Sequence, residues 1–225
     1  ADGVDGVGIA NQRASTIVWD RATGEPVGPG LGWQDLRTVG DCLVLAGQGI
    51  RMAPNALATK AAHVLDLADA DRTRDLCVGT VDSWVAWTLS GGALHVTDAT
   101  NAALYGLRTD DQTEWHRTVL GALRIPEAAL PTVVPTQGVC ATTRGLKSLP
   151  DGIPVAGICG DQQSALFGQL CHTPGEAKCT YGTGAFLLMN TGSRVVPSNS
   201  GLLTTLGWER PSEHRNAIDV TYALE

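Results

Sequence analysis

The sequence contains no uninterrupted apolar run of about 18 residues, the length that a membrane-spanning helix requires. Its opening, ADGVDGVGIA, has neither the basic start nor the apolar centre of a secretory signal peptide. Both absences argue against membrane insertion and secretion. We therefore expect a cytoplasmic protein with no membrane partner.

Excess positive charge and metal-binding cysteine pairs are also missing. Lys and Arg number 16 against 23 Asp and Glu, and no basic stripe occurs. Because a nucleic-acid binder neutralises phosphates with positive charge, nucleic acid is not an expected partner. The six cysteines form no Cys-x-x-Cys pair and the five histidines are scattered, so we expect reduced structural thiols rather than disulfides or metal ligands.

The 225 residues, 43% of them hydrophobic, are enough to bury a core, and we expect one mixed α/β domain, with two subdomains left open. Extended segments at 7–10 and 16–19 and a third that ends near residue 33 predict a β-meander. Apolar residues at three- and four-residue spacing predict three helices. These lie within residues 54–74, 80–89 and 115–123. Paired strands are predicted in AKCTYGTGAFLLMNTG and at 202–208 with 217–223.

A carboxylate follows a buried strand in IPVAGICGDQQSALFGQL, which reads as a strand, then Gly-Asp, then a helix. This is where α/β folds place ligand-handling groups, so Asp161 faces a crevice in this interpretation. Gly160 allows close backbone approach, and Gln162 can hydrogen-bond to hydroxyls. In the alternative interpretation Asp161 only caps the helix, and the local pattern by itself leans toward the cap.

The segment Thr180-Tyr181-Gly182-Thr183-Gly184 surrounds a hydroxyl residue with two glycines. Such a loop can present backbone N–H groups to a phosphate, but it also suits an ordinary hairpin turn, which the local pattern favours. No Gly-x-x-x-x-Gly-Lys-Ser/Thr motif occurs, which excludes a P-loop enzyme for this stretch of chain.

A cation and an indole follow the first extended segments. Arg13 comes just after the apolar strand VGIA, and Trp33 ends the third extended stretch. A guanidinium can bond the hydroxyls of a polyol while an indole covers its C–H face. The alternative, in which Trp33 is a core residue and Arg13 forms a surface ion pair, stays open at this point.

A series of spaced motifs runs along the chain: NQRAST, TGEP, GWQDLRT, TVDSWVAWTLSGG, HVTDATNAA, GICGDQQSALFGQ, TYGTGAFLLMNTG, SGLLTTLGW and TYALE. In this order the set resembles the glycerol kinase branch of the FGGY carbohydrate kinase family. The resemblance implies an actin-like ATPase (ribonuclease H-like) fold, a mixed sheet with flanking helices. It also implies transfer of the γ-phosphoryl group of ATP, with Mg²⁺, to a hydroxyl of glycerol or a related polyol or sugar.

The resemblance further implies that residues 1–225 are the substrate-binding domain, without the family's first strand and loop and without its ATP-binding domain. On this expectation the fragment alone is inactive. By position, Asp161 is the general base and the neighbour of the magnesium. The expected polyol-binding residues are Gln162, Arg13, Trp33 and Phe186, and the expected phosphate-binding residues are Thr183, Gly182 and Gly184.

Two positions depart from the pattern of the glycerol kinases. The Glu that usually follows the motif Asn-Gln-Arg is Ala14 here, and the Tyr of the usual Pro-Tyr-Phe is Asn55. We expect both to line a roomier substrate pocket with fewer matched partners for glycerol. Because an unmatched polar contact costs several kcal/mol of discrimination, glycerol itself is not the expected preferred substrate. The alternative function is a non-catalytic polyol- or sugar-binding domain, and homo-oligomer formation stays open.

Overall fold

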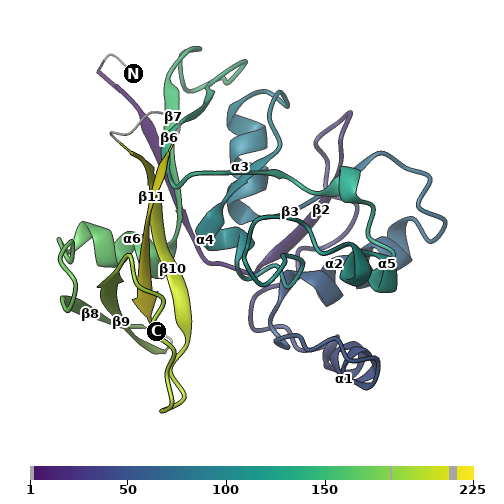
Figure 1. The fold of residues 1–225 in the computed structure, drawn as a ribbon. Coiled ribbons are helices and arrows are strands. Elements are labelled where there is room, and N and C mark those ends of the chain that lie inside the picture. The colour runs from purple at the N-terminus through teal and green to yellow at the C-terminus, as the bar shows by residue number, and fades with distance from the viewer. Residues whose placement is uncertain (1–2, 183, 213–216) are drawn as a thin grey trace.

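The computed structural model describes residues 3–182, 184–212 and 217–225 (Figure 1). The strands are β1 (Val7–Asn11), β2 (Thr16–Asp20), β3 (Leu76–Thr80), β4 (Val96–Asp98), β5 (Thr132–Val134), β6 (Gln137–Thr142), β7 (Pro154–Gly160), β8 (Ala177–Tyr181), β9 (Ala185–Gly192), β10 (Thr204–Pro211) and β11 (Ile218–Leu224). The helices are α1 (Val39–Gly47), α2 (Leu57–Ala68), α3 (Val81–Leu89), α4 (Ala99–Ala102), α5 (Arg117–Leu123) and α6 (Asp161–Gly168), with a 3₁₀ turn at Glu127–Ala129.

The described strands form two larger sheets and two strand pairs. One sheet has the order β1-β7-β6, with β1 parallel and β6 antiparallel to β7, and the other is the antiparallel sheet β10-β11-β9-β8. The pairs are β2 with β3 and β4 with β5. Figure 1 shows α6 beside the antiparallel sheet, and α1, α2 and α5 with β2 and β3 on the other side of the molecule. The predicted mixed α/β class is confirmed.

The predicted β-meander is wrong. β1 pairs with β7 and β2 pairs with β3, so consecutive strands enter different sheets. Between them the chain turns at Ala14, whose φ of 62° lies in the left-handed region and redirects the backbone. The third extended stretch forms only isolated bridges to β2, at Pro26 and Leu31.

The predicted helices are confirmed as α2, α3 and α5, and each begins one or a few residues after the start of its predicted range. Two glycines with positive φ, Gly91 and Gly92, follow α3. α2 supplies much of the main apolar core, because Leu57, Ala61 and Leu65 are almost fully buried there. Apolar burial of this kind is the main source of folding free energy. Among the described residues, no helix has the length and apolarity needed to span a bilayer.

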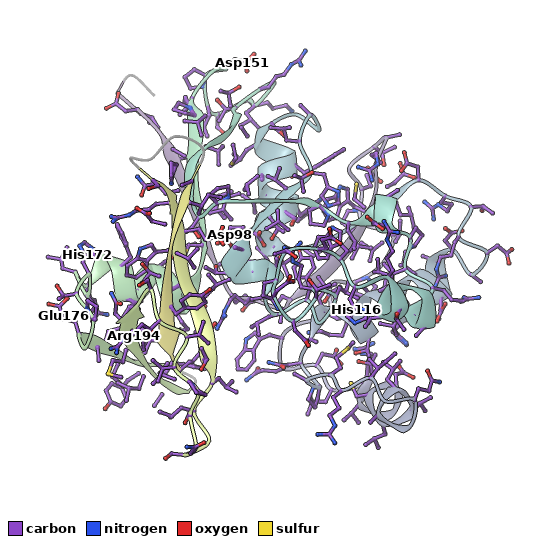
Figure 2. The ribbon with its side chains drawn as sticks, in the orientation of Figure 1. Asp98, His116, Asp151, His172, Glu176 and Arg194 are labelled. Atoms are coloured by element: carbon purple, nitrogen blue, oxygen red, sulfur yellow. The ribbon has the colours of Figure 1, made fainter. Side chains whose placement is uncertain are left out.

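Between the two sides of the molecule lies a central polar cluster, which we define as Asn11, Asp82, Asp98, Thr100 and Asn101, all buried. Figure 2 shows Asp98 near the middle of the molecule. Its carboxylate accepts hydrogen bonds from Asn101 Nδ2 at 2.8 Å and Thr100 Oγ1 at 3.0 Å. Asn11 Nδ2 donates to Asn101 Oδ1 at 2.9 Å, which ties the end of β1 to α4. Hydrogen bonding compensates the cost of burying these polar groups.

Asp82 makes the stability of this cluster pH-dependent. Burial raises the pKa of Asp82 to about 6 and the charge of Asp98 adds to the rise, while the hydrogen bond from Thr80 opposes it. Because the pKa of Asp82 is higher in the native state than in the unfolded state, the native state holds the proton more tightly. The resulting stabilisation of the fold is complete below the unfolded-state pKa of about 3.9 and is lost as pH rises through the native-state pKa.

As pH rises from 5 to 7, the titration of Asp82 is expected to lower the free energy of unfolding of the wild type by about 1.4 kcal/mol. We predict that this decrease is absent in Asp82→Asn. Urea unfolding of both proteins at the two pH values measures it. His95, whose pKa burial lowers to about 4, contributes with the opposite sign in both proteins and cancels in the comparison. Equal pH dependence in wild type and variant would contradict the prediction.

Candidate active site

The register of β1 and β7 brings two distant motifs together. Asn11 lies opposite Gly160 in the parallel pair, so the residues that follow each strand leave the sheet at the same edge. The Gly160 N–H donates to Thr100 Oγ1 at 2.9 Å, and that hydroxyl belongs to the central polar cluster. The cluster therefore fixes both strand ends, from which Arg13 and Asp161 extend.

A pocket of about 330 Å³ opens at this edge. It is lined by Gln12, Arg13, Ala14, Trp33, Asn55, Leu104, Asp161, Gln162, Thr180, Gly182, Gly184, Phe186 and Glu225. Every site residue expected from the sequence is in this set except Thr183, which lies outside the described residues. The structure thus gathers positions that are up to 173 residues apart in the expected set, from Arg13 to Phe186.

Arg13 is held rigidly in the pocket wall. Its Nη2 lies 2.7 Å from Glu225 Oε2 and its Nη1 donates to Thr205 Oγ1 at 3.2 Å, with only 6% of its side chain exposed. The alternative of a surface ion pair is wrong, because Arg13 is buried and the Glu225 side chain is only 17% exposed. Gly160 makes room for it, since a Cβ there would lie 2.6 Å from Arg13 Cδ. A guanidinium has five N–H donors, so Arg13 keeps donors beyond these two.

Two aromatic rings form another part of the wall. The Trp33 and Phe186 rings meet edge to face with centroids 6.4 Å apart. Trp33 is half-buried and lines the pocket, so the alternative of a core residue is wrong. Its backbone N–H donates to Ser15 Oγ at 3.1 Å, and Gln12 Nε2 donates to the same oxygen at 3.0 Å. The apolar wall is therefore attached to the loop that carries Arg13.

The two small residues also border the pocket. Ala14 keeps its unusual backbone because Lys60, itself buried, donates from Nζ to the Ala14 carbonyl at 2.6 Å and to the Gly32 carbonyl at 3.2 Å. Burial lowers the pKa of Lys60 to about 8, and the charge of Asp35 opposes that shift. Asn55 lies in the turn before α2.

Asp161 is the first residue of α6, exposed and part of the pocket lining. The helix N-cap is Gly160, and no side chain caps the helix, so the interpretation of Asp161 as an N-cap is wrong. One carboxylate oxygen, Oδ1, accepts from the Gln162 N–H at 2.9 Å. Within the described residues the other oxygen has no partner, so it can accept a proton or bind a cation.

The β8–β9 hairpin forms the remaining wall. The Gly182 N–H donates to the Gly184 carbonyl at 2.9 Å, which confirms the hairpin that the sequence favoured. Both glycines line the pocket, so a hairpin turn and a phosphate-binding role are compatible. Gly184 also lies under the Phe186 ring, which a Cβ would approach to 3.0 Å.

Sequence reasoning missed Glu225 and Lys178. Glu225 stands in the motif TYALE without an assigned role, because its partner Arg13 is 212 residues away. Lys178 is 3% exposed in β8 and donates to Thr180 Oγ1 at 2.9 Å and to the Gln162 side-chain oxygen. A lysine at the inward-facing position of an alternating strand was the available signal.

No group of three or more His, Cys, Asp or Glu side chains among the described residues forms a ready-made metal site. A magnesium ion bound with a nucleotide needs only one or two protein carboxylates, since phosphate oxygens and water supply the rest. Asp161 is exposed and lines the same pocket as Gly182 and Gly184, so its carboxylate fits such a single ligand.

Comparison with known proteins places the chain in a family. Residues 1–168 match the N-terminal domain of the FGGY family of carbohydrate kinases. The chain belongs to this family. It is 45% identical, over 97% of its length, to a glycerol kinase of Myxococcus xanthus and 46% identical, over its whole length, to a glycerol kinase of Aromatoleum aromaticum. These matches cover 46% and 47% of the two relatives, so the FGGY chain spans about half their length.

Solved structures agree on the fold. The FGGY chain matches a glycerol kinase of Plasmodium falciparum, solved with ADP, at a TM-score of 0.85 and 30% identity, over 98% of this chain and 46% of that one. A xylulose kinase of Rhodospirillum rubrum matches at 0.79 and 16% identity, over 98% and 45% of the two chains, which supports the fold alone. The predicted actin-like ATPase fold is confirmed.

Proposed function

We propose that this FGGY chain binds the acceptor substrate of an ATP-dependent kinase that phosphorylates a hydroxyl of glycerol or a related polyol or sugar. The observation that carries the proposal is the shared pocket, where a buried guanidinium, two aromatic rings and a free carboxylate oxygen meet. We also propose that residues 1–225 form the substrate-binding domain of the whole protein and that this fragment does not turn over by itself.

The pocket suits a polyol on chemical grounds. The remaining N–H donors of Arg13 bind hydroxyl oxygens, Glu225 accepts from hydroxyl groups, and the Trp33 and Phe186 rings cover the C–H face. With Ala14 and Asn55 in place of larger groups, the volume of about 330 Å³ accepts a substrate longer than glycerol. We therefore propose that glycerol is not the preferred acceptor.

Asp161 is the proposed general base. Asp161 lines the pocket, and its carboxylate accepts the proton of the attacking hydroxyl as the oxygen–phosphorus bond forms. Gly182, Gly184 and Thr183 are the proposed neighbours of the phosphate. Magnesium, when bound with the nucleotide, neutralises developing charge on the phosphate oxygens, and Asp161 is its proposed protein ligand.

A coupled assay of ADP release by the full-length gene product tests the function. The panel consists of glycerol, tetritols, pentitols and ketoses, with a reaction lacking any polyol as the control. We expect ADP release that depends on the polyol and is faster with at least one larger member than with glycerol. A folded protein that releases no ADP with any member would reject the kinase and favour the non-catalytic binding domain.

A further inference from the structure

Lys178 is a buried cation directly behind the pocket wall. It is 3% exposed, and within the described residues no carboxylate lies at ion-pair distance from its ammonium group. Burial lowers the pKa of Lys178, and the charges of Glu225 and Asp161 oppose that shift. A buried charge without an ion-pair partner is costly, so its hydrogen bonds have to compensate.

The contacts of Lys178 all lead to the pocket. Its Nζ donates to the Gln162 side-chain oxygen, to Thr180 Oγ1 at 2.9 Å and to the Phe186 carbonyl at 3.4 Å. These three acceptors match the three N–H donors of an ammonium group. All three partners line the pocket, whereas Lys178 does not. Lys178 therefore reaches a bound molecule only through its neighbours.

The contact with Gln162 decides which end of the amide faces the pocket. An ammonium group only donates, so the amide atom that meets it has to be the oxygen. The contact with Lys178 therefore fixes which way the Gln162 amide is turned, although the oxygen and nitrogen of such an amide are hard to tell apart by electron density alone. The Gln162 NH₂ group is then directed away from Lys178, on a side chain that lines the pocket.

We propose that Lys178 is a positioning residue that fixes the Gln162 amide so that its NH₂ group donates a hydrogen bond to a polyol hydroxyl oxygen. The inference rests on the proposed function, because it requires a polyol in the pocket. The ammonium group of Lys178 also links α6 to the β8–β9 hairpin, so both elements help to hold the Gln162 amide in place. A donor that is already oriented binds with less loss of side-chain entropy.

Two substitutions of Gln162 test the orientation in the full-length gene product. Gln162→Glu keeps an acceptor for Lys178, replaces the NH₂ donor by an oxygen and adds a negative charge, while Gln162→Ala removes both donor and acceptor. We expect each to raise the KM for the best polyol of the panel by about 10- to 100-fold, with kcat and the KM for ATP within about threefold of wild type. A Gln162→Glu protein with wild-type KM would show that the polyol needs no donor at this position and would overturn the proposal.

Lys178→Met tests the positioning itself, with the exposed Lys147→Met as the matched control. We expect Lys178→Met to raise the polyol KM about 10-fold or more and to add less than about twofold when Gln162 is already Ala. Additive effects, or an equal rise in the KM for ATP, would overturn the proposal. If Lys178→Met does not fold, the Gln162 pair still decides the orientation.

These outcomes are separate from a failure of the proposed function. A wild-type protein that turns over no polyol rejects the kinase proposal before any variant is compared. A wild-type protein that turns over a polyol, with Gln162 and Lys178 variants that keep the wild-type KM, rejects only the inference about Lys178.

Discussion

Asp161→Asn is expected to lower kcat for phosphoryl transfer by about 100- to 10,000-fold while the polyol dissociation constant stays within about threefold of wild type. The base acts on the transition state, where the attacking hydroxyl loses its proton, and contributes little to ground-state binding. Asn keeps the size and the remaining oxygen of the side chain but removes the negative charge. Coupled ADP release gives kcat, and calorimetric titration with the polyol gives binding.

The matched control is Asp71→Asn, an exposed Asp outside the pocket, which should keep wild-type kcat. Turnover near the wild-type rate in Asp161→Asn would show that Asp161 has no catalytic role. A parallel loss of polyol binding and turnover would instead make Asp161 a binding residue.

The double variant Ala14→Glu with Asn55→Tyr is expected to raise kcat/KM for glycerol, relative to the best larger polyol, by about 10- to 100-fold. The Glu adds an acceptor, the Tyr adds a hydroxyl, and both reduce the space of the pocket. The left-handed backbone at residue 14 is about as strained for Glu as for Ala, because both residues carry an unbranched Cβ. Kinetics with both substrates measure the ratio.

Controls separate the polar contacts from the loss of space. Ala14→Gln supplies similar length without the charge, and Asn55→Phe supplies the ring without the hydroxyl. We expect this control pair to reduce turnover of the larger polyol without the full gain for glycerol. A double variant with an unchanged preference would mean that residues 14 and 55 do not set the substrate.

The local sequence pattern was sufficient to predict an element where the spacing of its own apolar residues indicates a helix or a strand. The apolar spacing of α2 and α3 and the strand–helix change at Gly160 were predictable because each depends on neighbours in sequence. The strand β3 was missed, since LCVGT is buried on every residue and shows no alternation. The pairing of β1 with β7 was also missed, because it joins residues that are far apart in the sequence: Val7 pairs with Val155 and Asn11 pairs with Gly160.

The candidate site shows the same division. The expected residues that the structure describes all line one pocket, because motif order reflects the fold that brings them together. The pair of Arg13 with Glu225 and the contacts of Lys178 were not predictable, since each depends on a partner that only the folded chain supplies. Local pattern also favoured a helix cap for Asp161, which the geometry of α6 excludes.

The most direct test of the account is a crystal structure of the full-length gene product with its best polyol bound. We predict that one substrate hydroxyl oxygen lies about 2.6–3.2 Å from a carboxylate oxygen of Asp161, with the carbon chain between Arg13 and the ring of Trp33. A polyol bound outside this pocket, or bound there with no hydroxyl within reach of Asp161, would contradict it.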